Sequence, residues 1–205
     1  MVFELPAPEL QDSESLVGCI EARRSVREYT KAPLPLGVLS QLLWSAQGVT
    51  GADQKRSTPS AGGLYPLHLQ IVVQRVSELE PGTYEYKADS HSLELVGSCI
   101  PEGAMHELGI GDQPWLKESA IVIGVSAKLG DAVLHFESQP PQGERGARYV
   151  YMETGAQNVH LQSTALGVGC VLVAGFDDAR VKEALRLPSN LEPTALLCIG
   201  QRRDI

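Results

Sequence analysis

The pattern of hydrophobic and polar positions predicts two helices in the first quarter of the chain. In the stretch SLVGCIEARRS, apolar side chains recur at helical spacing, and Ser13 or Ser15 is a suitable N-cap. The prolines of the following KAPLPLG stretch prevent this helix from continuing. A second helix is predicted over residues 37–47, which carry leucines on one side, and residues 48–54 are predicted to form a loop.

Strand patterns dominate the rest of the chain. Residues 83–97 predict a hairpin, because tyrosines and then leucines alternate with polar residues on either side of a turn at residues 88–90. Runs rich in β-branched residues indicate further strands, two of them fully buried. These strands are expected at residues 68–76, 119–127, 168–176 and 193–200.

Two more helices are predicted in the second half. The longest spans about residues 148–167, and a short one within FDDARVKEAL begins at Asp177 or Asp178, either of which suits the first turn. Helices and strands mix without a strict βαβ rhythm, so the fold class is predicted as α+β, with a mixed, mainly antiparallel sheet flanked by helices. Without repeats or a long linker, residues 1–205 are expected to form a single domain.

Composition narrows the function classes. The chain has 205 residues, 43% of them hydrophobic and 20% charged, with a net charge of −8 and a pI of about 5.1. A nucleic-acid or anionic membrane surface needs a broad basic footprint, so neither partner is expected. The N-terminus lacks a basic start and an apolar run, and no window is apolar enough to cross a bilayer. A cytoplasmic protein is therefore expected.

Common catalytic and metal-binding patterns are missing. The four cysteines are far apart and form no C-x-x-C pair, so buried, reduced thiols are expected rather than disulfides or zinc. The five histidines are dispersed, and no metal site is predicted. Because no Walker A, H-E-x-x-H or G-x-S-x-G motif occurs, no catalytic side chain is predicted either.

The stretch EARRSVREYT concentrates positive charge within an acidic chain. If the first helix reaches it, Arg23 and Arg27 stand four residues apart on one face, where like charges repel by about 0.2–0.5 kcal/mol. A phosphate between the guanidinium groups would reverse the sign of that term, and Ser25 would add a hydroxyl donor. Alternatively, the cluster is a solvated helix end, where the dipole favours cations. The spacing alone is compatible with both interpretations.

Two glycine-containing stretches are weaker candidates. In STPSAGGLYPLH, residues 57–68, prolines, glycines and small side chains precede a strand, as in loops that approach a ligand with free N–H groups. In ALGVGCVLVAGFDD, residues 165–178, a strand ends before a capped helix, and backbone amides there are placed to face a ligand. Considered separately, a plain turn and close glycine packing explain these two stretches better.

Taken together and in this order, the three motifs resemble the nitroreductase family of flavin enzymes. The matching stretches are ARRSVREYT, TPSAGGLYPLHLQIVV and ALGVGCVLVAGFDDARVKEAL, followed by a closing strand, and the resemblance covers about residues 14–203. The motif PSAGGLYPL is most similar to the corresponding motif of the SagB-type dehydrogenase branch. The resemblance implies an intertwined homodimer that binds one FMN per subunit at the dimer interface.

The resemblance also implies which residues bind FMN. The R-R-S-x-R pattern implies phosphate and ribityl contacts, the P-S loop would line the flavin, and the end of a strand would lie near its N5 edge. In many members an asparagine stands near Gly63, and in some a glutamate stands at Ala174, so this chain lacks two side-chain contacts. The implied set is Arg23, Arg24, Ser25, Arg27, Pro59, Ser60, Ala61, Gly62, Gly63, Leu64, Val173, Ala174, Gly175 and Arg202.

The resemblance therefore implies an FMN-dependent oxidoreductase in which hydride passes through flavin N5. NAD(P)H is the expected reductant, and a small electrophilic or heterocyclic molecule the expected substrate. Azoline-oxidising members of the branch carry a Lys-Tyr pair where this chain has Pro141 and Gln142, so azoline peptide dehydrogenation is a lesser alternative. A third alternative is an FMN-binding carrier module with little turnover.

Overall fold

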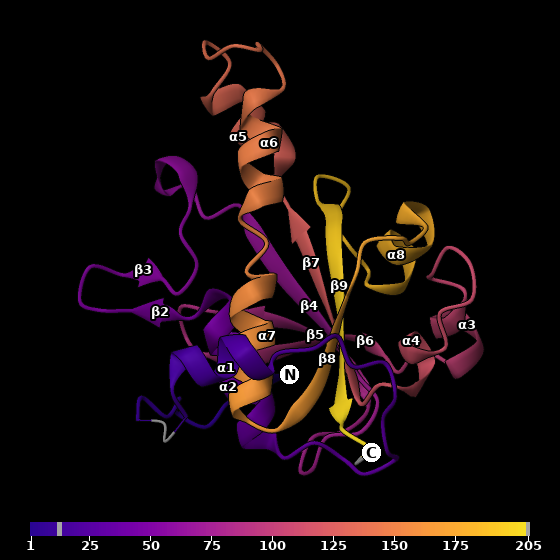
Figure 1. The fold of residues 1–205 in the computed structure, drawn as a ribbon. Helices are drawn as coiled ribbons and strands as arrows, with labels where there is room; N and C mark the ends of the chain where they lie inside the picture. The colour runs from indigo at the N-terminus through magenta and orange to yellow at the C-terminus, as the bar shows by residue number, and fades with distance from the viewer. Residues whose placement is uncertain (12–13, 204–205) are drawn as a thin grey trace.

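A seven-stranded sheet runs through the centre of the protein (Figure 1). The computed structural model describes residues 1–11 and 14–203. Every neighbouring pair of strands is antiparallel, so the expectation of a mixed sheet is wrong, whereas the α+β class is confirmed. The order is β1 (Val2–Glu4), β6 (Ser92–Ser98), β5 (Gly82–Lys87), β4 (Leu67–Val73), β7 (Ile121–Ala127), β9 (Glu192–Gln201) and β8 (Val168–Val173). The connection from β7 to β8 joins two strands that run in the same direction, because β9 lies between them and is antiparallel to both.

Helices cover both faces of this sheet. On one face, α2 (Leu36–Gln47) and α7 (Ala156–Ala165) share a core cluster with Ile71 of β4. On the other face, α3 (Glu102–His106), α4 (Trp115–Glu118) and α8 (Asp178–Ala184) share a second cluster with Val72. Because successive side chains of a strand point to opposite faces, these two residues separate the clusters. All seven residues of β7 are buried, as predicted for a strand covered on both sides.

The predicted strands are confirmed in position, but one of them differs in extent and burial and one predicted helix is two. The strand expected to be fully buried over 168–176 ends at Val173 and leaves Leu172 43% exposed, because β8 lies at the edge of the sheet. The hairpin β5–β6 turns where the sequence indicated. Instead of one helix over 148–167, the chain forms α6 (Arg145–Met152) and α7, separated at Gly155 with φ +65°. A Cβ at this position would lie 2.9 Å from the carbonyl oxygen of Ala46, so only glycine fits the junction without strain. Helices α5 (Leu129–His135) and α6 project beyond the sheet (Figure 1).

Two further differences concern short elements. The predicted loop 48–54 begins with β2 (Val49–Thr50), which pairs with β3 (Lys55–Arg56) in a small separate hairpin. Helix α1 (Leu16–Ala22) is capped by Ser15, whose Oγ accepts a hydrogen bond from the Gly18 N–H at 3.0 Å. The alternative cap, Ser13, lies outside the described residues.

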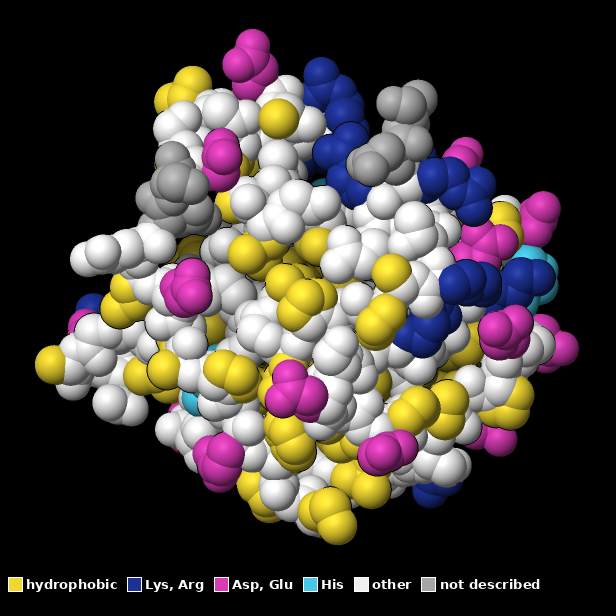
Figure 2. Space-filling view, turned by 90° about the horizontal axis from the view of Figure 1, so that it is seen from below, with side chains coloured by type: hydrophobic (Ala, Val, Ile, Leu, Met, Phe, Trp, Pro, Cys, Tyr) yellow, Lys and Arg dark blue, Asp and Glu magenta, His cyan; other side chains and the backbone are white. Residues whose placement is uncertain are grey.

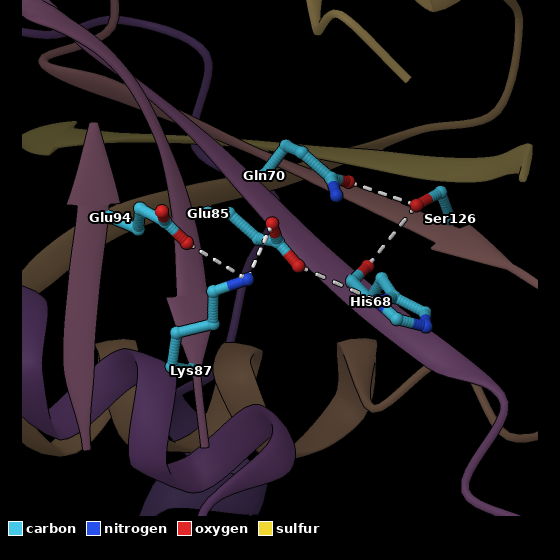
Figure 3. A network of polar contacts seen from close by, with 6 residues as sticks. All are labelled: His68, Gln70, Glu85, Lys87, Glu94 and Ser126. Atoms are coloured by element: carbon cyan, nitrogen blue, oxygen red, sulfur yellow. Dashed lines mark hydrogen bonds and ion pairs between the residues drawn. The ribbon is translucent and has the colours of Figure 1, made fainter. Parts of the chain in front are cut away.

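A polar network occupies one end of the face that also carries Val72 (Figure 3). The Lys87 ammonium lies 2.7 Å from Glu85 and 3.2 Å from Glu94, and the Ser126 hydroxyl donates to the Gln70 side-chain oxygen at 2.9 Å. Because Lys87 pairs with Glu85 and Glu94, the charges of this network largely neutralise one another within the sheet. The network consists of His68, Gln70, Glu85, Lys87, Glu94 and Ser126.

The cysteines largely match the expectation. All four are free; Cys19, Cys170 and Cys198 are buried, whereas Cys99 is exposed. Burial raises the pKa of the Cys170 thiol to about 12, which makes it a poor nucleophile at neutral pH. Among the described residues, no group of three potential ligands is arranged for a metal ion. Within the same part of the chain, every helix is too short or too polar to cross a membrane.

Candidate functional site

The arginine segment, residues 23–27, leaves helix α1 and lies against strand β8. Helix α1 ends before Arg23, so the prediction of a helix through residue 25 is wrong and the condition for placing Arg23 and Arg27 on one helical face is not met. The cause is tertiary, because the Val26 N–H donates to the carbonyl oxygen of Cys170 at 2.9 Å. Pairing with the sheet edge overrides the local helical pattern.

Tyr29 fixes the far end of this segment. Its buried hydroxyl lies 2.8 Å from the carbonyl oxygen of Val26 and 2.9 Å from that of Cys198. Burial raises the pKa of Tyr29 above its usual range, so the hydroxyl stays a hydrogen-bond donor. The backbone of Tyr29 also pairs with Arg202. The structure therefore brings Arg202 beside the arginine segment, although 175 or more residues separate them in sequence.

Two guanidinium groups of the segment have defined neighbours. Arg24 Nη1 donates to the carbonyl oxygens of Glu21 at 2.8 Å and Arg23 at 2.7 Å, at the C-terminal end of α1. Arg27 lies over the Trp115 ring, 5.3 Å from its centroid. Each contact uses only part of a guanidinium group, which has five N–H donors. Donors are therefore left for an anion.

The surroundings of the segment favour an anion. Figure 2 looks at the end of the molecule where β9 terminates, and it shows Lys and Arg side chains gathered on one part of that face. Ser25 is exposed there, and Glu28 lies 3.8 Å from Arg203. His160 of α7 is buried; burial, and then the positive charge of Arg23, lower its pKa below the usual value. A neutral His160 adds no positive charge, so the attraction for an anion comes from the arginines.

The second predicted part is loop 59–64, which contains a short 3-10 helix, η1 (Ala61–Gly63). Gly62 and Gly63 have φ values of +64° and +65°, a backbone conformation that favours glycine. A Cβ on Gly62 would lie 3.1 Å from His135 Nε2, whereas a Cβ on Gly63 would face open space. The open side of Gly63 leaves room for a flat group to approach the backbone.

The expectation of free amides in this loop is wrong for three residues. The Ala61 N–H donates to Glu153 Oε1 at 2.5 Å. The amides of Gly63 and Leu64 donate to the carbonyl oxygens of Ser60 at 3.1 Å and Ala61 at 3.4 Å. Turn formation consumes these donors. The loop therefore offers a glycine surface to a ligand rather than a row of unused amides.

The third predicted part is the end of strand β8. Val173 is buried in the core, so its side chain is not available to a ligand, whereas Ala174 and Gly175 are exposed. The carbonyl oxygen of Gly175 accepts hydrogen bonds from the Ile110 N–H at 2.9 Å and from Gln113 Nε2 at 2.6 Å. These bonds fix the exposed backbone at the strand end.

The predicted site forms two groups within one chain. The arginine segment and the strand end both contact the region of α4, through Trp115 and Gln113. Loop 59–64 instead packs against α5 and the junction between α6 and α7. Across the described residues, no hydrogen bond, ion pair or ring contact joins the loop to the arginine segment.

Sequence reasoning missed three residues of these two groups. Gln113 and Trp115 lie in an unremarkable segment, and only their contacts reveal them. Glu153 falls within the single helix predicted over residues 148–167, and its role was not recognised. The glycine of ETGAQN was the available signal, because a glycine in a helical pattern often marks a helix boundary.

The structure thus combines an α+β fold, a basic segment at the edge of the sheet and a glycine-containing loop. A model of the nitroreductase family matches residues 20–201. The chain therefore belongs to the nitroreductase family and is an oxidoreductase of that family.

Similar proteins agree with this assignment. A Methanocaldococcus jannaschii protein named as a nitroreductase is 34% identical over 204 residues, which cover 98% of this chain and 97% of that one. A Thermus thermophilus NADH dehydrogenase is 27% identical and covers 87% of this chain and 82% of its own length. A nitroreductase-type crystal structure from Ralstonia eutropha matches the fold with a TM-score of 0.79 at 24% identity, over 100% of this chain and 90% of that one.

Proposed function

We propose that this protein is an FMN-dependent oxidoreductase that passes hydride between NAD(P)H and a small electrophilic or heterocyclic substrate. The observation that carries the proposal is the junction of the arginine segment with Arg202, which Tyr29 holds together across the sheet edge. A dianionic phosphate suits this group, because four arginines lie on neighbouring stretches of backbone and a guanidinium group can bind phosphate through two N–H donors. Arg23, Arg24, Arg27 and Arg202 would hold the phosphate, with Ser25 as an additional donor.

The flavin ring requires a flat, uncrowded surface. Gly62 and Gly63 of loop 59–64, flanked by Pro59, Ser60, Ala61 and Leu64, suit one side of such a ring, and the exposed backbone at Ala174 and Gly175 suits its edge. Within one chain these surfaces belong to different groups. A homodimer in which the loop of one subunit completes the arginine segment of the other resolves that separation.

An exposed apolar surface supports the homodimer. On helix α1, Leu16 is 64% exposed, Val17 75% and Ile20 57%. Three large apolar side chains on one short helix are more than the scattered exposure of a monomer surface. Burying them against a second copy would add favourable apolar area beside the arginine segment.

When bound, FMN supplies hydride transfer at its N5 position. The protein's own residues bind the phosphate, orient the ring and exclude water. No nucleophile is required, in agreement with the raised pKa of Cys170. The similarity to an NADH dehydrogenase supports a nicotinamide reductant.

Azoline peptide dehydrogenation is the less favoured alternative within the SagB-type branch. Pro141 and Gln142 stand where that activity has a Lys-Tyr pair, in the turn between α5 and α6. Neither side chain has a titratable group, so neither can act as a general base or general acid. A low-turnover FMN carrier is the other alternative, and the spectrum described next distinguishes it.

The test is the visible spectrum of the purified protein after FMN supplementation and desalting, before and after anaerobic addition of NADH or NADPH. A retained flavin spectrum that bleaches supports the proposal. Retained flavin that no nicotinamide reduces would favour a carrier or another reductant. Absence of retained flavin would refute the phosphate site.

A further inference from the structure

A cavity of about 560 Å³ lies between loop 59–64 and the junction of α6 with α7. Its wall consists of residues 58–61 from the loop side, Tyr149 of α6, and residues 152–158 at the junction. Small-molecule sites typically measure roughly 300–1,000 Å³, so a one- or two-ring compound fits here. The cavity adjoins the loop to which we assign one side of the flavin.

Glu153 is the one acidic side chain of this wall, and it is 9% exposed. One carboxylate oxygen, Oε1, accepts the Ala61 N–H. The other, Oε2, is enclosed and has no hydrogen-bond partner among the described residues. A buried acceptor without a partner costs free energy, because water no longer solvates it. A ligand that donates a hydrogen bond to Oε2 would recover that cost.

The other residues that line the cavity also favour a hydrogen-bond donor over an anion as the ligand. The lining residues from this part of the chain include no lysine, arginine or histidine, so an anionic ligand gains no partner there. The amide of Asn158 is occupied, since its Nδ2 lies 3.1 Å from the carbonyl oxygens of both Ser45 and Ser57. Pro59, Tyr149 and Met152 supply apolar surface. The cavity therefore combines apolar surface with one buried carboxylate, beside the uncharged polar side chains of Thr58, Ser60, Thr154 and Gln157.

We propose that this cavity binds the oxidisable or reducible substrate, that the substrate is a flat, apolar ring compound carrying an N–H donor, and that Glu153 selects it through that donor. This inference rests on the proposed function, since it names the substrate class of the same site. Oε2 is fully enclosed in this structure, so a donor in the cavity reaches it once the Glu153 carboxylate turns. The terminal torsion of glutamate is broad, so this turn costs little.

The test uses three ring probes of equal size against the FMN-loaded protein: benzamidine, which is a cationic donor, benzamide, a neutral donor, and benzoate, which only accepts. Dissociation constants are measured by calorimetry, independently of turnover. We expect benzamidine to bind at least about tenfold more tightly than benzoate, with benzamide between them, as a hydrogen bond to a charged acceptor allows. Glu153→Gln should remove about tenfold of the benzamidine affinity.

Glu153→Gln keeps an oxygen that accepts the Ala61 N–H, so the loop should remain folded, which a thermal melt verifies. The matched control is Glu137→Gln, an exposed carboxylate at the end of α5 that does not line the cavity. It should leave all three constants unchanged. Equal binding of benzamidine and benzoate, or equal effects of the two variants, would overturn the role of Glu153 while FMN retention still supported the proposed function. Failure of the wild type to retain FMN would instead overturn the proposed function.

Discussion

The guanidinium group of Arg27 lies over the indole ring of Trp115, 5.3 Å from its centroid. Trp115 begins helix α4, and two residues earlier Gln113 binds the carbonyl oxygen of Gly175. One short segment thus contacts both the arginine segment and the end of β8. The phosphate side and the N5 side of the proposed flavin site are thereby held to a common support.

Replacing Trp115 tests this support. A cation–π contact of this kind contributes about 0.5–2 kcal/mol, so Trp115→Leu should weaken FMN binding roughly twofold to thirtyfold. Trp115→Phe retains an aromatic face and should have a smaller effect. The measurement is a titration of FMN fluorescence against apo-protein. Equal affinities of the two variants would show that the aromatic ring does not position Arg27.

Arg24→Ala should reduce FMN retention more strongly. Its guanidinium group keeps charge-assisted donors besides the one that binds the carbonyl oxygens of Glu21 and Arg23, and loss of one phosphate contact should lower the affinity about tenfold or more. The control is Arg148→Ala, which removes an exposed arginine paired with Glu144 on α6. Flavin content after desalting is the readout. Unchanged content in Arg24→Ala would contradict the phosphate site.

Gly155→Ala should destabilise the fold. Its φ of +65° alone costs an alanine about 1–2 kcal/mol, and its Cβ would also lie 2.9 Å from the backbone oxygen of Ala46. Gly167→Ala is the matched control, because Gly167 has φ +68° but open space around a Cβ. Urea unfolding should give a total loss of about 3 kcal/mol for Gly155→Ala and about 1 kcal/mol for Gly167→Ala. Similar losses would mean that the junction adapts to a side chain.

Stability should decrease as the pH falls below about 6.5. Burial, followed by the charge of Arg23, lowers the pKa of His160, and burial also lowers those of His68 and His91. The unfolded chain then binds more protons than the folded one between pH 6.5 and the lowered values, so the unfolding free energy drops across that window. Urea unfolding at pH 7.5 and 5.5 should show a smaller difference for His160→Gln than for the wild type. An unchanged difference would exclude His160 as a contributor.

Ile20→Glu should disrupt the proposed homodimer. The change places a charge within the apolar surface of α1, where burial would leave it unpaired. Val2→Glu serves as the control, since Val2 is 61% exposed on β1, away from α1. Light scattering coupled to size exclusion should report a dimer for the wild type and the control and a monomer for Ile20→Glu. A monomeric wild type would refute the dimer itself.

Local patterns predicted the strands well, because successive side chains of a strand point to opposite faces of the sheet. The burial of each face therefore appears in the sequence as alternating or continuous apolar residues. The hairpin β5–β6 and the fully buried β7 illustrate this. The same reasoning failed for the arginine segment. The local pattern favoured a helix through residue 25. The hydrogen bond from the Val26 N–H to Cys170, which ends the helical path, depends on a strand almost 150 residues away. A single sequence contains no direct sign of such a contact.

The candidate site was predicted in part for a related reason. The sequence motifs indicated Arg24, Gly62 and Gly175 as site residues. Contact between FMN and each of these residues stays a prediction. The neighbours that fix these motifs were not identified. Glu153 and Gln113 act through single hydrogen bonds to distant backbone atoms, and such bonds leave no periodicity in the sequence. The separation of loop 59–64 from the arginine segment was likewise visible only in three dimensions.

Strand order has a consequence for biogenesis. β9 lies between β7 and β8, although it follows both of them in the chain, so β8 has no place in the sheet until β9 has inserted. The arginine segment bonds to this late-forming edge through the Val26 N–H and the Cys170 carbonyl oxygen, and Tyr29 beyond the segment pairs with Arg202. During synthesis on a ribosome, binding of the proposed FMN would therefore wait until β9 has emerged. Before that point, the arginines of the nascent chain would have no sheet edge to hold them around the phosphate. Cofactor capture would then report completed folding.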